Sequence, residues 1–160
     1  MNIILNIKII QFYNKILVIN IMSNLQVKIS DKIIFDGDII PLKETKSFPK
    51  ISFSKKEGEY YTIIIVDPDA PSRNNPINKY FLHMLIINNT DEIVKYTPPD
   101  PPKSSGKHRY FIFLLKQNGV MDKNYLKINI FGRAKFNLGE FIADNHLEIV
   151  DSVYFLTESR

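Results

Sequence analysis

The sequence predicts a mostly β protein, a β-sandwich of short strands with one or two short helices. Three observations favour this fold class. Runs rich in β-branched and aromatic residues recur along the chain, turn residues separate them, and the clearest helical spacing is confined to a short segment near the C-terminus. At 160 residues the chain is long enough for one domain with a substantial core and too short for two comfortable ones.

The first predicted strands lie between residues 25 and 53. Residues 25–29 alternate apolar and polar side chains, as a half-buried strand does. The run Lys32–Phe35 leads into Asp36-Gly37, a dipeptide typical of a hairpin turn. Ile51–Phe53 is the next short strand.

Longer apolar runs predict the central strands. They cover Tyr60–Val66, Tyr80–Asn88 and Arg109–Lys116, and a shorter late strand is expected at Val153–Thr157. The runs at 80–88 and 109–116 are apolar on both faces, as expected of central strands covered on both sides. The helix is predicted over Leu138–Asp144, with Asn137 in position to cap it.

Residues 1–22 are interpreted as an N-terminal extension and residues 23–160 as a single domain. Polar side chains interrupt the apolar residues of the extension, so it lacks the roughly 18 consecutive apolar residues of a transmembrane helix. The proline cluster Pro98–Pro102 lies between two predicted core strands and is interpreted as a rigid surface loop. A polyproline II ligand for an SH3-like partner is the alternative.

Composition excludes several classes of function. The chain carries no cysteine, so it has no disulfide, no thiol nucleophile and no cysteine zinc site. Such a chain is compatible with a reducing compartment, and we expect the cytoplasm. The formal net charge is +4, but the basic residues are dispersed, so no nucleic-acid partner is expected.

The most distinctive segment is the point where an aliphatic strand ends in two carboxylates locked between prolines. Pro68 and Pro71 push the residues before them into extended geometry. If the chain stays extended through Asp69, the carboxylates of Asp67 and Asp69 lie on one side. Roughly 6 to 7 Å apart, they would repel by about 2 to 3 kcal/mol at an effective dielectric near 20. A cation, a metal ion or backbone N–H groups are expected to answer that charge.

Two histidines fall within the predicted central strands. By two-residue alternation, His83 shares an apolar face with Leu85 and Ile87, and a core histidine is the commoner explanation of such a pattern. His108 opens the next strand and shares a face with Tyr110, which would place an imidazole beside a phenol. Taken singly, each of these observations is weak.

Taken in order, the motifs resemble the phosphatidylethanolamine-binding protein family. They run from Asp67-Pro68-Asp69-Ala70-Pro71-Ser72-Arg73 through His83 and Tyr96 to Pro101-Pro102-Lys103-Ser104-Ser105-Gly106-Lys107-His108-Arg109-Tyr110. The resemblance covers roughly residues 25–157. Members that share these motifs include Raf kinase inhibitor proteins, carboxypeptidase Y inhibitors and the flowering-time regulators of plants.

The resemblance implies a β-sandwich with a small anion pocket at the ends of its central strands. The pocket residues that carry over are Asp67, Asp69, Pro71, His83, His108 and Tyr110. In that family the pocket accepts phosphate-like groups, including the phosphorylethanolamine headgroup. The resemblance also implies a cis peptide bond between Ala70 and Pro71.

Side-chain chemistry suggests a role for each of these polar groups. His108, Tyr110 and His83 would donate hydrogen bonds to phosphate oxygens. Asp67 would accept from a histidine N–H, and Asp69 would cap loop amides or meet an amine headgroup.

The chain departs from the family pattern around this pocket. Phe81-Leu82 stands where the family often has Trp-His, which removes a polar contact and keeps an aromatic floor. Pro98 and Asp100 replace glycines common in the family's loop, which limits backbone approach to phosphate and adds a negative charge.

We therefore expect a non-enzymatic, regulatory binding protein without cofactor or metal, whose ligand is a phosphate-like anion or a phosphatidylethanolamine-type headgroup. Peripheral contact with a membrane is left open. The main alternative is an interaction module that inhibits a kinase or protease through its surface, at Pro98–Lys107 or the basic segment Lys43–Lys56. A metal-dependent hydrolase using the two aspartates and two histidines is a weaker alternative, because these residues lack the local spacing common in metal sites.

Overall fold

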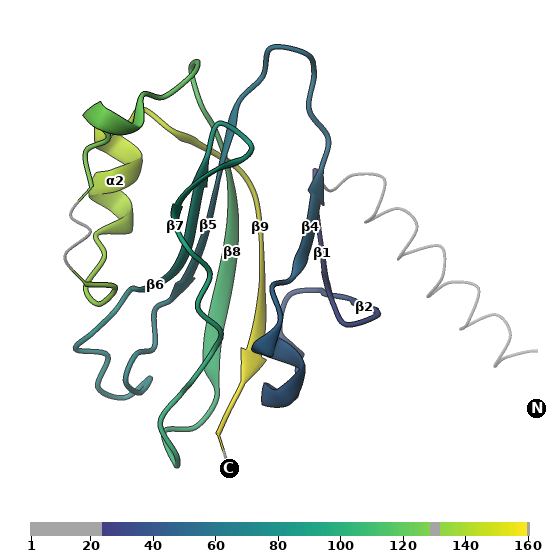
Figure 1. Cartoon of the computed structure of the whole chain (residues 1–160). Helices are drawn as coiled ribbons and strands as arrows, with labels where there is room; N and C mark the ends of the chain where they lie inside the picture. Colours follow the sequence, from purple (N-terminus) through teal and green to yellow (C-terminus); the bar gives the residue numbers. More distant parts are fainter. Residues whose placement is uncertain (1–23, 129–131, 160) are drawn as a thin grey trace, which may run out of the picture.

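The computed structural model describes residues 24–128 and 132–159. The extension predicted over residues 1–22 lies outside the described residues, so the domain boundary at residue 23 stays a prediction. Within the described part, the chain is mostly β, as predicted, and the strands form two sheets (Figure 1).

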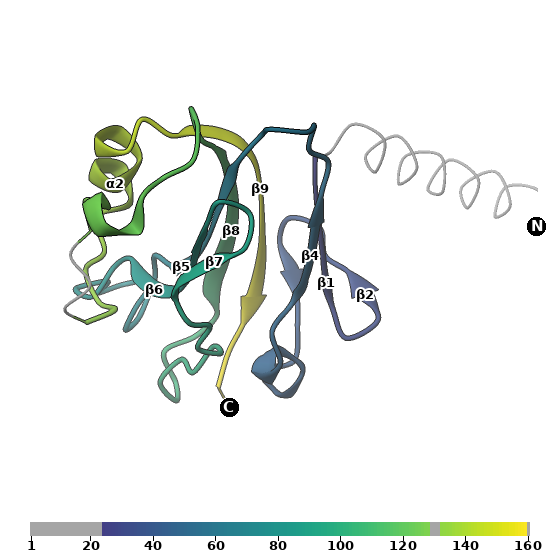
Figure 2. The same ribbon diagram turned by 45° about the horizontal axis from the view of Figure 1, so that its top comes forward.

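A six-stranded sheet lies between a helix on one side and a three-stranded sheet on the other (Figures 1 and 2). The large sheet has the strand order β3-β9-β8-β5-β6-β7, and the small sheet has the order β2-β1-β4. The strands of the large sheet are β3 (Asp38–Ile39), β9 (Glu148–Thr157), β8 (His108–Lys116), β5 (Tyr61–Asp67), β6 (Phe81–Ile87) and β7 (Asp91–Val94). The small sheet contains β2 (Lys32–Ile33), β1 (Leu25–Ile29) and β4 (Lys50–Phe53). All pairings are antiparallel except that of β3 with β9.

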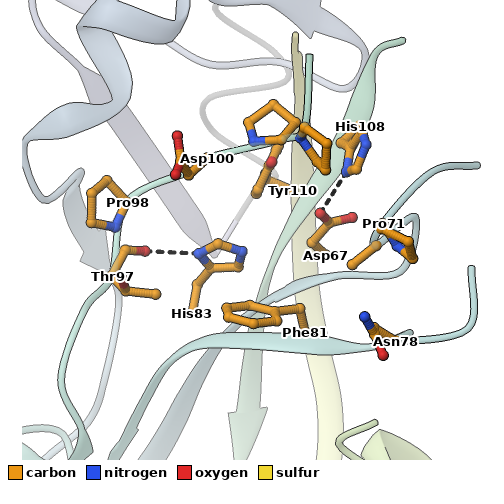
Figure 3. A pocket seen from close by; sticks show the side chains of 13 residues that line it. Asp67, Pro71, Asn78, Phe81, His83, Thr97, Pro98, Asp100, His108 and Tyr110 are labelled. Atoms are coloured by element: carbon orange, nitrogen blue, oxygen red, sulfur yellow. Dashed lines mark hydrogen bonds and ion pairs between the residues drawn. The ribbon is translucent and has the colours of Figure 1, made fainter. Parts of the chain in front are cut away.

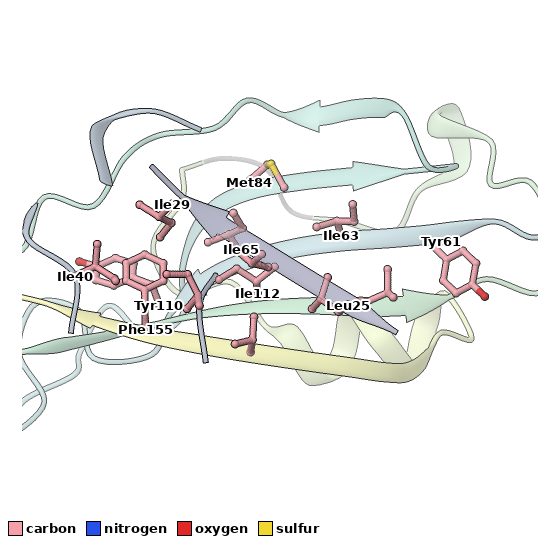
Figure 4. Packing of buried hydrophobic residues seen from close by; sticks show 14 residues of the cluster. Leu25, Ile29, Ile40, Tyr61, Ile63, Ile65, Met84, Tyr110, Ile112 and Phe155 are labelled. Carbon is pink, nitrogen blue, oxygen red and sulfur yellow. The ribbon is translucent and has the colours of Figure 1, made fainter. Parts of the chain in front are cut away.

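Strand β5 is buried along its whole length because both faces of the large sheet are covered. Ile63 and Ile65 face the small sheet, in a core that includes Leu25 and Ile112 (Figure 4). Ile64 and Val66 face the other way, in a second core that packs against α2 (Leu138–Asp144). This double coverage explains why the sequence of β5 is a continuous apolar run rather than an alternating one.

The helix α2 agrees with the prediction in both bounds and cap. The side chain of Asn137 accepts a hydrogen bond from the backbone N–H of Glu140 at 3.1 Å. Two further helical turns are 3₁₀: η1 (Leu42–Lys46) and η2 (Lys123–Tyr125). None of the described helices is long and apolar enough to cross a membrane.

The hairpin predicted at Asp36-Gly37 is wrong. The hairpin of the small sheet turns earlier, between Ile29 and Lys32. Asp36-Gly37 instead carries the chain from the small sheet to β3 in the large one, where the N–H of Gly37 donates to the carbonyl of Tyr154 at 3.0 Å. Gly37 has a φ of 82°, so the dipeptide does form a turn, but the partner of the strand that follows is β9 and not β2.

Candidate functional site

A pocket of about 360 Å³ opens at the end of the sandwich where β5 ends and β6 and β8 begin (Figure 3). The loop from Thr97 to Pro102 forms its opposite wall. Its lining residues are Asp67, Ala70, Pro71, Asn78, Phe81, His83, Thr97, Pro98, Asp100, Pro101, Pro102, His108 and Tyr110. The pocket therefore brings together five of the six residues predicted for the site, all but Asp69.

A hydrogen-bonded chain of three side chains includes two residues of the pocket lining, Asp67 and His108. The Oδ2 atom of Asp67 lies 2.7 Å from Nδ1 of His108, and Nε2 of His108 lies 2.9 Å from Oγ of Ser105. Asp67 and His108 are 3% and 0% exposed, so water does not compete for the hydrogen bond between them. Asp67 thus accepts from a histidine N–H, as the side-chain chemistry suggested.

Both ring nitrogens of His108 are engaged within the protein. The hydroxyl of Ser105 donates to the carbonyl of Pro102 at 2.6 Å, since a carbonyl can only accept. Ser105 Oγ is then left to accept the N–H at Nε2 of His108, while Nδ1–H donates to Asp67. In this arrangement His108 has no spare ring nitrogen for a ligand. The Ser-His-Asp order is that of a hydrolase triad, yet the serine proton points to Pro102 and not to the histidine.

His83 reaches the pocket through an irregularity in β6. Ile65 pairs with Met84 and Val66 pairs with Leu82, so His83 is the extra residue of a β-bulge. The bulge interrupts the two-residue alternation: Leu85 faces the α2 side, whereas the ring of His83 contacts Tyr110 at a centroid distance of 5.2 Å. The prediction that His83 shares a face with Leu85 is therefore wrong, and the bulge is what turns the imidazole toward the pocket.

The imidazole of His83 is held by the backbone of the opposite wall. Its Nδ1 lies 2.7 Å from the carbonyl of Thr97, and the N–H of Thr97 donates to the carbonyl of His83 at 2.9 Å. Burial lowers the pKa of His83 below its usual value of 6.5, and the bond to Thr97 and the charge of Asp67 only partly oppose this effect. The ring is therefore predominantly neutral near pH 7.

Arg133 holds the bulge in place from outside the pocket by hydrogen bonds to its backbone. Its guanidinium donates to the carbonyls of Leu82 at 3.1 Å, of His83 at 3.0 Å and of Lys95 at 2.8 Å. Its own carbonyl accepts the N–H of Leu82 at 2.7 Å. Sequence reasoning missed Arg133 as well as Ser105. Ser105 belongs to a motif already singled out, but nothing near Arg133 in the sequence indicates a contact some 50 residues away.

Tyr110 lies at the base of the pocket between two other rings. Its ring packs edge-on against His83 and stacks on Phe155 at a centroid distance of 5.3 Å. Burial, reinforced by the charge of Asp67, raises the pKa of the Tyr110 phenol far above its usual value of 10.0. The phenol therefore stays protonated and can donate a hydrogen bond into the pocket.

Asp69 lies outside the pocket lining, in a separate ion pair. Its carboxylate accepts from Nη2 of Arg109 at 2.6 Å, from Nε of Arg109 at 3.0 Å and from the backbone N–H of Arg109 at 2.9 Å. Arg73 adds a contact at 3.3 Å. Burial alone would raise the pKa of Asp69, but the bonds from Arg109 outweigh it, so that the pKa lies below its usual value of 3.8.

The two carboxylates do not lie on one side, contrary to the prediction. Strand β5 ends at Asp67, where the Oδ1 of Asp67 accepts the N–H of Asp69 at 2.7 Å and turns the chain. Each carboxylate has its own partner: the imidazole of His108 for Asp67 and the guanidinium of Arg109 for Asp69, where the expected compensating cation is confirmed. The Ala70–Pro71 peptide bond after this turn is cis, as the resemblance implied.

The mouth of the pocket carries the departures from the family pattern. Pro98 and Asp100 both line it, and the side chain of Asp100 is 90% exposed. Lys46 of η1 approaches this loop, with its Nζ 3.9 Å from Asp100 and 3.4 Å from the carbonyl of Pro99. Among the described residues, no group of three or more His, Asp or Glu side chains is placed to hold a metal ion.

Fold and pocket together define a class of protein: a β-sandwich with a small polar pocket at the ends of its central strands. Residues 30–154 match the family model described as phosphatidylethanolamine-binding protein. The chain therefore belongs to the phosphatidylethanolamine-binding protein family, which confirms the resemblance found in its motifs.

Individual relatives agree with this assignment. A phosphatidylethanolamine-binding protein homolog of Acanthamoeba polyphaga mimivirus is 51% identical, over 86% of this chain and 99% of its own length. The structure of carboxypeptidase Y inhibitor complexed with its cognate proteinase matches with a TM-score of 0.73 at 24% identity, over 85% of this chain and 83% of that one. The phosphatidylethanolamine-binding protein of Plasmodium vivax matches with a TM-score of 0.66 at 24% identity, over 85% of each chain. At this identity the two structures show a shared fold.

Proposed function

We propose that the protein is a non-enzymatic, regulatory binding protein whose pocket takes a phosphate-like anion or a phospholipid headgroup of the phosphatidylethanolamine type. The observation that carries the proposal is the convergence of His83, His108 and Tyr110 on one pocket of about 360 Å³. Asp67 and Pro71 complete the proposed site. We assign Asp69 a supporting role, because its carboxylate is fully used by Arg109 and Arg73.

In this proposal each polar group has a separate task. Tyr110 donates its O–H to an anion oxygen, and the ring of His108 shapes the wall beside the ligand without a direct bond. Asp67 holds that ring in place. At the mouth, the exposed carboxylate of Asp100 accepts the ammonium group of a phosphorylethanolamine ligand, so that the residue which departs from the family pattern would favour a zwitterionic headgroup over a bare anion.

The test is an NMR titration of the labelled protein with inorganic phosphate and with phosphorylethanolamine at about pH 6. Ligand should shift the signals of His83 and Tyr110, and Tyr110→Phe should weaken binding by about tenfold through loss of one hydrogen bond to a charged group. The control is Tyr154→Phe, a tyrosine of β9 that does not line the pocket. Unmoved pocket signals at millimolar ligand, in a folded protein, would contradict the proposal.

A second candidate function is an interaction module that inhibits a protease or a kinase through its surface. Its support is the contact between the two surface segments singled out in the sequence. The phenol of Tyr96 donates to the carbonyl of Thr45 at 2.9 Å, and Lys46 reaches the carbonyl of Pro99. The basic segment and the proline loop therefore form one continuous surface beside the pocket mouth. A relative, carboxypeptidase Y inhibitor, is described in complex with a proteinase.

A carboxypeptidase inhibition assay separates this candidate from the first. Inhibition that Lys46→Glu abolishes and Tyr110→Phe leaves intact would favour the surface, and the reverse would favour the pocket. We further propose the cytoplasm as the compartment, with peripheral membrane contact as the route by which a headgroup reaches the pocket. Cell fractionation of the tagged full-length chain measures both.

A further inference from the structure

We propose that the pocket selects phosphate groups that carry their own proton, and that the bare Nε2 atom of His83 is the acceptor that selects them. The inference rests on the proposed function and narrows it: of the two kinds of ligand named there, it favours a free phosphate monoester over the diester phosphate of a membrane lipid. A singly protonated phosphate monoester fits this rule. Sulfate and phosphate diesters, which carry no proton on the anionic group near neutral pH, do not.

The geometry around His83 assigns the proton on its ring. The carbonyl of Thr97 can only accept, so the 2.7 Å contact requires a hydrogen on Nδ1. In the neutral ring Nε2 then carries a lone pair and no hydrogen. This nitrogen points into the pocket and has no hydrogen-bond partner among the described residues (Figure 3). His83 therefore accepts a hydrogen bond from a ligand, rather than donating one as its chemistry alone suggested.

The charges that face His83 keep the ring neutral near pH 7. Burial is the main cause of the lowered pKa of His83, and Arg133, which bonds to the carbonyl of His83 itself, and His108 on the neighbouring wall add to it. Asp67 favours protonation, but its carboxylate is already paired with His108 at 2.7 Å. The remaining ionisable groups of the pocket are Tyr110, which stays a neutral phenol, and Asp100, which is exposed to solvent at the mouth.

No other lining residue compensates for this bare nitrogen. His108 uses both of its ring nitrogens inside the protein, and none of the described residues that line the pocket is a lysine or an arginine. Near neutral pH the pocket base thus offers one donor, the O–H of Tyr110, and one acceptor, Nε2 of His83. An oxygen of a dianion placed against Nε2 would bring its own lone pairs against the lone pair of the nitrogen, and this contact is repulsive. A P–O–H group in the same place makes a hydrogen bond.

The experiment compares four probes by calorimetry between pH 5.5 and 8: inorganic phosphate, phosphorylethanolamine, sulfate, and glycerophosphoethanolamine as the diester of the lipid headgroup. At pH 6.5 we expect the two probes that can carry a proton to bind about tenfold more tightly than sulfate, because one hydrogen bond is replaced by an unsatisfied acceptor. The affinity for phosphorylethanolamine should fall as the pH rises above about 6, the second pKa of a phosphate monoester, because the protonated form is then lost. Phosphorylethanolamine should also bind more tightly than the diester.

Two variants assign the selectivity to the correct residue. His83→Gln offers both a donor and an acceptor at this position and should reduce the preference for phosphate over sulfate to about twofold or less. Tyr110→Phe is the matched control, since loss of its donor should weaken phosphate and sulfate equally and preserve their ratio. Nitrogen-15 shifts of the His83 ring should show a protonated Nδ1 and a bare Nε2 in the free protein at pH 7.

Each outcome separates the inference from the proposed function. If phosphate and sulfate bind equally at pH 6.5, or if the ring carries its proton on Nε2, the inference is overturned and the anion pocket stands. Diester binding as tight as that of phosphorylethanolamine also overturns it and shows that the site reads the lipid headgroup. If none of the four probes binds to the folded protein, the proposed function itself fails.

Discussion

Asp67 and Asp69 are the same residue type, two positions apart, and both are buried, yet they serve different structures. Asp67 is 3% exposed and faces the pocket, where its partner is the buried imidazole of His108. Asp69 is 1% exposed and is paired with Arg109, whose charge is permanent. The first carboxylate therefore belongs to the pocket, and the second to a clamp formed by Asp69 and Arg109 outside it.

The difference arises from a single turn. The Oδ1 of Asp67 accepts a hydrogen bond from the N–H of Asp69, and the strand ends there. The carboxylate of Asp69 therefore lies on the other face of the sheet. There Arg109 lies over the ring of Phe111, on the α2 side. Neighbouring positions of β8 serve the two sites: His108 points to the pocket and Arg109 to the clamp. The register of β8 thus places the pocket histidine and the clamp arginine at consecutive positions.

The largest effect on stability is expected from Asp69→Asn. Removal of the carboxylate leaves the Arg109 guanidinium, whose side chain is 38% exposed, without its bidentate partner. Loss of a fully buried partner costs about 3 to 5 kcal/mol, and the partial exposure of Arg109 reduces this to about 2 to 3 kcal/mol. Urea unfolding measures it. The control is Asp144→Asn, at an exposed position. A urea midpoint for Asp69→Asn equal to that of the control would show that the clamp does not stabilise the fold.

Asp67→Asn should have the opposite effect, with a small loss of stability and a large loss of phosphate affinity. The amide keeps an acceptor for one of the two N–H groups that Asp67 binds, so the stability loss should be only about 1 kcal/mol. His108 loses the carboxylate that fixes its orientation, so phosphate affinity should fall by about tenfold. Calorimetry on both variants checks the contrast, because Asp69→Asn, assayed where it is folded, should keep its affinity within about threefold of wild type. Equal losses of phosphate affinity in Asp67→Asn and Asp69→Asn would contradict the separation of the pocket from the clamp.

Much of this architecture could be predicted from the sequence, and the exceptions have physical causes. The central strands and α2 follow from local patterns: apolar runs, turn residues and a capping asparagine. The faces of His83 and Asp69 do not, because a bulge and a side-chain turn interrupt the alternation on which the prediction depends. Arg133 was missed because it bonds to backbone carbonyls, which every residue has, so the side chains of its partners do not indicate the contact.

The two sites should also lose stability in different pH windows. The pKa of His83 is lowered on folding, so below about pH 6.5 the unfolded chain binds a proton that the folded chain does not, and stability falls as the pH falls. The slope is at most about 1.4 kcal/mol per pH unit for one proton. The pKa of Asp69 is also lowered, so its contribution is lost only as the pH falls below about 3.8. Unfolding curves of His83→Gln should lack the first decline and keep the second.

The smallest effect is expected at the outer edge of the clamp. Arg73 contacts Asp69 at 3.3 Å, but its side chain is 49% exposed and water screens the pair. Arg73→Gln should therefore cost no more than about 0.5 kcal/mol in urea unfolding, and added salt should shrink even that difference. Arg109→Gln is the matched substitution at the inner partner and should cost several times more, because it also leaves the buried carboxylate of Asp69 without its bidentate bond. If the two arginines prove equivalent, then total charge near Asp69 holds the turn, and the bidentate geometry that distinguishes this site from the pocket has no energetic role.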